Sequence, residues 1–151
     1  CVASFVPVHY AETSRNKQYI TNAQNVMLLL SKQVDEYRRI KQYFNAGGSI
    51  PKPLLGTEHI WRLSKEELLA LNNNRKQEMQ RILFEVSSFS SKFDHLVSCV
   101  QAFAEVDVTK LRDKQGDIQK AITEIKVEPV VSLYTYLSRK HRKTYFEKPL
   151  L

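Results

Sequence analysis

An uninterrupted heptad pattern constrains the fold more than any other feature of this 151-residue chain. Between Ser64 and Ala104 there is neither proline nor glycine, and apolar residues recur at alternating intervals of three and four. This spacing places them on one side of an α-helix and is typical of coiled coils. The repeat consists of Met79, Ile82, Val86, Phe89, Phe93, Leu96, Val100 and Phe103. A helix over 64–104 would be about 60 Å long, so we expect an elongated protein.

The start of this helix is marked by a capping box. Ser64 is followed three residues later by Glu67. In this motif the serine hydroxyl accepts from the Glu67 amide, and the glutamate carboxylate returns to the serine amide. We therefore expect the helix to begin at Ser64. The polar stretch at 72–75 interrupts the apolar pattern and is compatible with a local kink.

A second heptad pattern predicts another long helix over residues 14–45. Only Lys41 interrupts it, and further apolar residues widen its apolar face beyond a single stripe. The pattern consists of Ile20, Ala23, Met27, Leu30, Val34, Tyr37 and Phe44. Gly47 and Gly48 end the helix, because glycine readily adopts the left-handed conformation found after helix C-termini. A helix that is apolar on more than one side needs several neighbours, which favours a partner chain.

Shorter elements are expected on either side of these two helices. The phase shifts after Phe103, which predicts a third helix over 109–126 and a short C-terminal helix over 130–142; a bent continuation of the helix 64–104 is the alternative. Pro7 predicts an extended lead-in over residues 1–12. The expected fold is all-α: a single elongated domain spanning 1–151, with the two long helices in an antiparallel bundle or coiled coil.

Several functional classes receive no support from the sequence. No run of eighteen apolar residues exists, so no membrane span is predicted. Cys1 and Cys99 lack a metal-ligand spacing, and no two of the four histidines lie three or four residues apart. There is no glycine-rich phosphate loop or nucleophile elbow. We therefore expect a non-enzymatic protein without metal or cofactor. The absence of an Asn-x-Ser/Thr acceptor and the few cysteines favour an intracellular compartment, nuclear or cytoplasmic.

The net charge of +7 is concentrated in a basic tail over residues 139–151. Basic and aromatic side chains alternate there, a combination that suits single-stranded nucleic acid, a localisation signal or an acidic protein partner. The residues concerned are Arg139, Lys140, Arg142, Lys143 and Tyr145.

The pattern as a whole predicts a structural or scaffolding subunit of a larger assembly, pairing with itself or another protein through the two apolar seams. Phe84 lies off the heptad pattern and would mark a partner surface if it faced outward. A nucleic-acid-associated factor using the basic tail is the first alternative. A secreted four-helix signalling protein is the second, and a disulfide between Cys1 and Cys99 would distinguish it.

Overall fold

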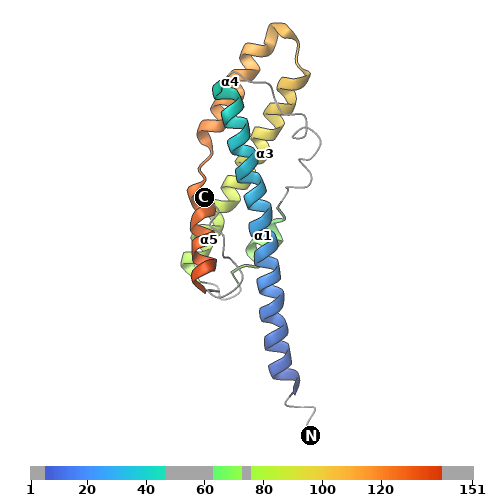
Figure 1. Ribbon diagram of the computed structural model, residues 1–151, viewed down its shortest axis with the longest axis vertical. Coiled ribbons are helices and arrows are strands. Elements are labelled where there is room, and N and C mark those ends of the chain that lie inside the picture. The colour runs from blue at the N-terminus through green and yellow to red at the C-terminus, as the bar shows by residue number, and fades with distance from the viewer. Residues whose placement is uncertain (1–5, 47–62, 73–75, 141–151) are drawn as a thin grey trace.

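The computed structural model describes residues 6–46, 63–72 and 76–140, and all regular structure within these ranges is helical. The elements are α1 (Val6–Ala46), α2 (Lys65–Leu69), α3 (Gln77–Glu105), the 3-10 turn η3 (Val108–Lys110), α4 (Leu111–Glu124) and α5 (Glu128–Lys140). They pack into an elongated bundle (Figure 1), so the predicted all-α fold is confirmed. None of the described helices is long and apolar enough to cross a membrane.

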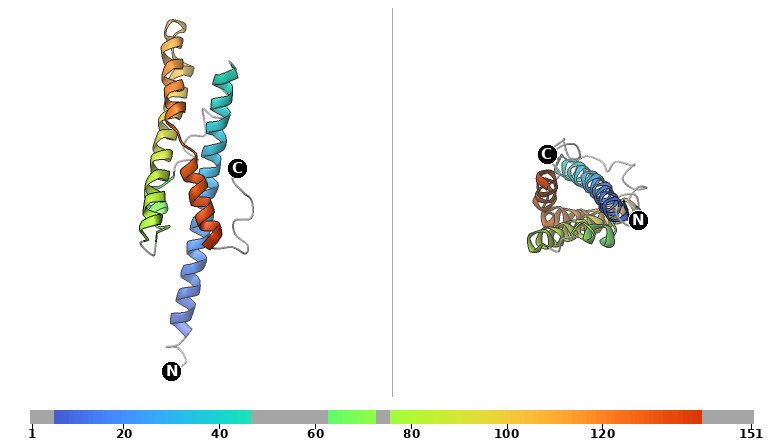
Figure 2. Two further views of the ribbon diagram at one scale, coloured as in Figure 1. Left: turned by 90° about the vertical axis from the view of Figure 1, so that its left-hand side faces the viewer. Right: turned by 90° about the horizontal axis from the view of Figure 1, so that it is seen from below.

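The two long helices run parallel to each other, not antiparallel as predicted. Gln33 of α1 lies against Ser90 of α3, and Phe44 lies against Phe103. Residue numbers therefore increase in the same direction along both helices. The chain runs back through α4 and α5, which follow one another beside α3 (Figures 1 and 2). The bundle thus has three columns. The first is α1, the second is α3, and the third consists of α4 followed by α5, with a break between them. Thirty residues separate the end of α1 from the start of α3, enough chain to return and start α3 in the same direction.

The start of α1 differs from the extended lead-in expected over residues 1–12. The helix begins at Val6 and includes Pro7. Proline is tolerated in the first turn, where amide groups have no intrahelical acceptor. The prediction is therefore wrong from Val6 onward, and residues 1–5 lie outside the described part of the chain. The end of α1 at Ala46 matches the stop predicted before Gly47.

The helix predicted over 64–104 is divided into α2 and α3. Asn72 makes two hydrogen bonds with the backbone of Lys76: its Oδ1 accepts from the Lys76 amide at 3.0 Å, and its Nδ2 donates to the Lys76 carbonyl at 3.3 Å. Asparagine side chains that bond to nearby backbone compete with helical hydrogen bonding. The polar interval was expected to kink a single helix, whereas the structure has two separate helices, α2 and α3.

Ser64 caps α2 as predicted. Its Oγ accepts from the Glu67 amide at 3.3 Å. The same Oγ donates to Glu66 Oε2 at 2.8 Å. A backbone hydrogen bond lowers the pKa of the Glu66 carboxyl, and the hydrogen bond from Ser64 lowers this pKa further. The carboxylate that contacts the cap is therefore that of Glu66, whereas the capping box predicts that of Glu67.

The third column is broken between Glu124 and Glu128. The predicted third and fourth helices, 109–126 and 130–142, correspond to α4 and α5 with small shifts at their ends. Pro129 lies in the first turn of α5, a favourable place for proline. At the break, Tyr37 of α1 donates its hydroxyl to the Ile122 carbonyl at 3.3 Å. This bond ties α1 to the point where the third column changes helix.

The core of the bundle contains the members of both heptad patterns. Of the α3 pattern, Ile82 and Phe103 are half-buried and the other six residues are buried. Phe44 and Phe103 pack edge to face, with ring centroids 5.5 Å apart. Lys41, which interrupts the α1 pattern, is exposed, and its ammonium lies 6.0 Å from the centre of the Tyr37 ring. Aliphatic and aromatic burial of this extent is the main stabilising contribution to the fold.

Candidate functional site

The residues predicted to form partner seams are placed inside the bundle. In α1, Ile20 is half-buried and the other predicted seam residues are buried. In α3, most of the predicted seam residues are buried as well. Buried α1 members are Met27, Leu30, Val34, Tyr37 and Phe44. These side chains pack against helices of the same chain, so they leave little apolar surface for a partner. A partner surface has to be sought on the outside of the bundle.

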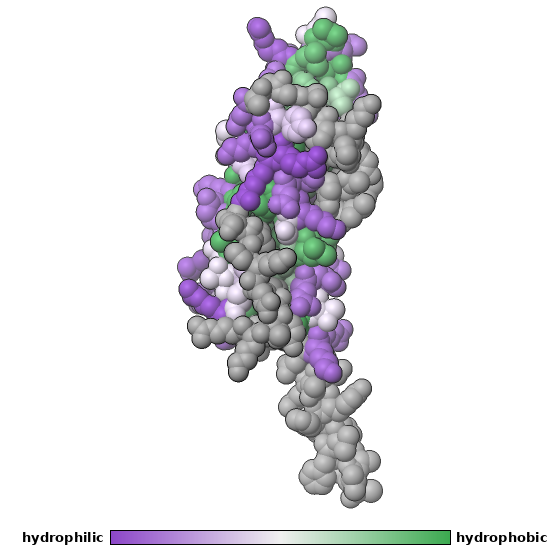
Figure 3. Space-filling model, viewed as in Figure 1, coloured by the Kyte–Doolittle hydropathy of each residue, from purple (hydrophilic) through white to green (hydrophobic). Residues whose placement is uncertain are grey.

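Among the residues that the structure describes, four large apolar side chains are exposed: Leu28 (57%), Leu69 (58%), Phe84 (78%) and Val108 (84%). Val108 belongs to η3, at the end of the bundle where α3 turns into α4; Figure 3 shows apolar side chains gathered at that end. Phe84 differs from the others because it is aromatic, and it lies in the first third of α3. Phe84 faces outward. The sequence predicts a partner surface at Phe84 if its side chain faces outward.

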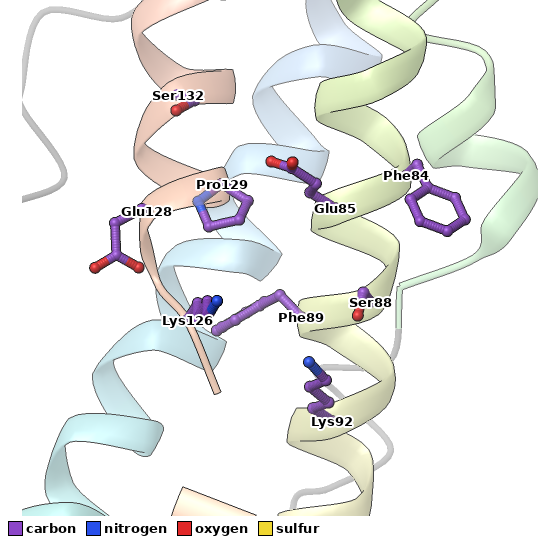
Figure 4. A pocket seen from close by; sticks show the side chains of 9 residues that line it. All are labelled: Phe84, Glu85, Ser88, Phe89, Lys92, Lys126, Glu128, Pro129 and Ser132. Carbon is purple, nitrogen blue, oxygen red and sulfur yellow. The ribbon is translucent and has the colours of Figure 1, made fainter. Parts of the chain in front are cut away.

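Phe84 stands between two grooves. The first, the α3–α5 groove, has a volume of about 580 Å³. Figure 4 shows Phe84 on the α2 side of α3, whereas Phe89 points toward the segment around Lys126. Charges of both signs line this groove, so it is not selective for one sign of ligand charge. Its lining consists of Phe84, Glu85, Ser88, Phe89, Lys92, Lys126, Glu128, Pro129 and Ser132.

The second groove, the α2–α3 groove, lies on the other side of Phe84 and has a volume of about 460 Å³. Its only charged side chain is Lys65, and apolar residues from both helices contribute to its walls. Exposed Leu69 lies on its α2 side. The lining residues are Lys65, Leu68, Leu69, Gln80, Leu83, Phe84, Ser87, Ser88 and Ser91. We call Leu69, Gln80, Phe84, Glu85, Ser88, Ser91 and Lys92 the Phe84 surface.

Four serines lie close together in the sequence of α3, at positions 87, 88, 90 and 91, and the fold divides them. Ser90 is buried and accepts from Gln33 Nε2 at 3.3 Å. Ser87, Ser88 and Ser91 line the α2–α3 groove. Their small side chains leave the groove open beside Phe84.

His95 and Cys99 lie one helical turn apart on α3 and bring an imidazole next to a thiol. The Cys99 Sγ is a free thiol 3.6 Å from His95 Nε2. Burial raises the pKa of the Cys99 thiol, Asp117 raises it further, and Lys114 opposes them. A raised pKa keeps the thiol protonated at neutral pH, whereas nucleophilic cysteines need a lowered one. The pair therefore has the geometry of a dyad without its activation.

Metal ligation can be assessed only for residues 6–46, 63–72 and 76–140. Within them no three side chains of His, Cys, Asp or Glu are grouped so that they could hold an ion. His9 has no described side chain, and His59 and His141 lie outside the described residues.

The basic tail is described only at its start. Arg139 is exposed near the end of α5, and Lys140 is the last residue of that helix. Arg142, Lys143 and Tyr145 lie outside the described residues, as does Cys1. Nucleic-acid binding and the disulfide to Cys99 therefore stay predictions from the sequence.

Comparison with known proteins adds no family: no family model matches the chain, and no curated protein or solved structure is significantly similar to it. The class defined by the structure is an all-α helical bundle that exposes an aromatic residue between two grooves.

The heptad patterns do not indicate Leu69 or the charged residues Glu85 and Lys92. A detectable signal was nevertheless present, because a second set of positions on α3 lies two residues after each member of the inner pattern. Two residues correspond to about 200° around a helix, so this set faces outward. Its charged members are Arg81 and Glu105, and Phe84 is its large apolar member.

Proposed function

We propose that this chain is a non-enzymatic structural subunit that binds a protein partner through the Phe84 surface. The observation that carries the proposal is the 78% exposure of Phe84, in a helix whose inward-facing phenylalanines Phe89 and Phe93 are buried. The partner would replace water on an aromatic ring that the chain's own fold leaves uncovered.

The energetic support comes from the size of the exposed side chain. Burial of apolar area contributes about 25 cal/mol per Å², so covering a phenylalanine and a leucine would contribute a few kcal/mol. Aromatic residues that enter a pocket are frequent hot spots of protein interfaces. The two grooves beside Phe84 provide the concave surface on which helix-in-groove binding depends.

The test is affinity purification of the full chain from native extract, with quantitative mass spectrometry of co-eluting proteins. We compare the wild type with Phe84→Ser, which removes the exposed ring while retaining the inward-facing core. The proposal requires that at least one specific partner is lost or reduced about tenfold, equivalent to about 1.4 kcal/mol.

Leu28→Ser is the matched control, since Leu28 is also a large exposed apolar residue, but it lies on α1. This variant should retain the partner. Equal retention of every co-eluting protein by wild type and Phe84→Ser would contradict the proposal, as would equal loss in both variants.

Nucleic-acid binding through the basic tail is the alternative proposal. It requires that binding to single-stranded RNA or DNA weakens steeply as salt increases, because phosphate contacts release counterions. Removal of residues 139–151 should abolish this binding, while Phe84→Ser should leave it unchanged. The secreted four-helix alternative requires a mass shift on reduction of a Cys1–Cys99 disulfide.

A further inference from the structure

The outer side of α3 carries a second heptad pattern, opposite the one that packs into the core. Its positions alternate by four and three along the helix, and each is exposed or half-buried. They are Gln77, Arg81, Phe84, Ser88, Ser91, His95, Ser98 and Ala102. Over 26 residues this stripe is about 38 Å long. Phe84 is its only large apolar member.

The charges beside this stripe are complementary under a two-fold rotation. Glu85 and Lys92 are exposed and lie one heptad apart on the same flank of the stripe. In an antiparallel pair of identical helices, each flank meets the same flank of the other copy. Glu85 would then face Lys92 of the second copy, and Lys92 would face its Glu85. Flanking charges of this kind set the partner and orientation of coiled coils.

This arrangement also restricts the register. With Ser88 opposite Ser91 of the second copy, Phe84 meets the imidazole of His95 and the two Glu85–Lys92 pairs align. A slide by one heptad in one direction places Glu85 against Glu85, and a slide in the other direction places Lys92 against Lys92. Like charges in contact are unfavourable, so the register with Lys92 against Lys92 is disfavoured. In the register with Glu85 against Glu85, exposed Glu78 on the same flank would face Lys92 of the other copy, so the contact between Phe84 and His95 is what favours the proposed register over that one.

We propose that the occupant of the Phe84 surface is a second copy of this chain, paired antiparallel through α3 in this register. The proposal rests on the proposed function, because it uses the same surface, and it adds the identity of the partner. The inner pattern stays within each copy, so the fold of the subunit does not change. The stripe contains four polar hydroxyl or amide residues for each aromatic ring, so the expected dimer is reversible and dependent on concentration.

The test uses the purified full chain and sedimentation velocity between about 1 µM and 1 mM, a range that covers weak association. Wild type should change from monomer to dimer. Glu85→Lys and Lys92→Glu should each raise the dissociation constant about tenfold, since each converts two attractive pairs into repulsive ones. Circular dichroism verifies that these exposed positions leave the helix content unchanged.

The decisive arm mixes the two single variants. Glu85→Lys and Lys92→Glu should associate with each other about as tightly as wild type does with itself, because both contacts are again oppositely charged. The double variant should also regain self-association. A matched reversal on α1, Lys32→Glu, alters an exposed charge remote from this stripe and should have no effect.

A monomeric wild type over the whole range would overturn the proposal, as would dimerisation that is insensitive to both charge reversals or a mixture no stronger than its components. These failures are distinct from failure of the proposed function. If the purified chain is monomeric and Phe84→Ser still loses a protein from extract, the surface binds a different partner. If neither self-association nor any extract protein depends on Phe84, the surface itself is wrongly assigned.

Discussion

Gln33 of α1 donates a hydrogen bond from Nε2 to the Oγ of Ser90 in α3, 3.3 Å away, and both residues are buried. The two residues are 57 positions apart in the sequence. A polar pair within a helix–helix contact favours the alignment in which the two groups meet, because other alignments bury them without this hydrogen bond.

The first prediction concerns this pair. Ser90→Ala should lower the free energy of unfolding by about 1 kcal/mol, since it removes a buried hydrogen-bond acceptor. Combined with Gln33→Met, it should cost less than the sum of the single substitutions, with a coupling of about 0.5–1.5 kcal/mol. Urea unfolding of the four proteins measures the coupling. Ser91→Ala, at the exposed neighbouring position, should change stability by less than about 0.5 kcal/mol. Strict additivity would show that the contact contributes nothing.

The second prediction contrasts two phenylalanines of the same helix. Phe93→Asp should abolish folding, because a buried ring is replaced by a carboxylate in the core and the cost is comparable with the whole stability of a small protein. Phe84→Asp makes the same chemical change at a position that is 78% exposed, so the helix content and melting temperature should be retained. Circular dichroism distinguishes the two. A folded Phe93→Asp protein would refute the assignment of the inner pattern to the core.

The third prediction concerns stability at alkaline pH. Burial raises the pKa of the Tyr37 hydroxyl above its usual 10.0, and Glu128 raises it further. The native state then retains a proton that the unfolded chain releases, so this stabilisation is complete below pH 10 and is lost as pH rises through the native pKa. Tyr37→Phe should cost about 1 kcal/mol at pH 8, and a smaller amount at pH 11.

Urea midpoints of both proteins at the two pH values test this sign. Tyr19 has a pKa raised by burial and by Tyr136, so the wild type alone would not isolate Tyr37. An equal cost of Tyr37→Phe at both pH values would contradict the prediction.

The fourth prediction concerns Gly116, in the middle of α4. No atom outside the local backbone lies within 4 Å of a Cβ added there. Glycine within a helix is destabilising by about 0.5–1 kcal/mol relative to alanine. Gly116→Ala should therefore raise the thermal midpoint by a few degrees, as followed by calorimetry. The larger, β-branched Gly116→Val should gain less. A loss of stability on Gly116→Ala would mean that this face of α4 is covered.

Helix content and the inward faces could be read from the sequence because both are local properties. The alternation of three and four residues from Met79 to Phe103 reports directly which side of α3 is apolar. The cap at Ser64 depends only on the next few residues, and Gly47 follows the observed end of α1. The partner seams followed the same pattern, but the pattern does not distinguish burial within the chain from burial against another.

The direction of the helices and the break before α3 were not predictable on this basis. Parallel packing of α1 and α3 depends on the long connection between them and on contacts such as Gln33 with Ser90. The break depends on the two hydrogen bonds between Asn72 and Lys76, which only the folded geometry reveals. The Phe84 surface required the placement of α2 beside α3, because Leu69 and the α2–α3 groove come from both helices.

The parallel course of α1 and α3 has a consequence for how the molecule assembles. The connections within the part from α3 to α5 are short, whereas Tyr37 reaches Ile122 across 85 residues. Contacts between distant residues form slowly because the loop between them must first close. We therefore expect α3, α4 and α5 to associate first and α1 to dock last. Until it docks, the inward phenylalanines of α3 are accessible to the α1 helix of another copy, so refolding at high protein concentration should produce domain-swapped pairs.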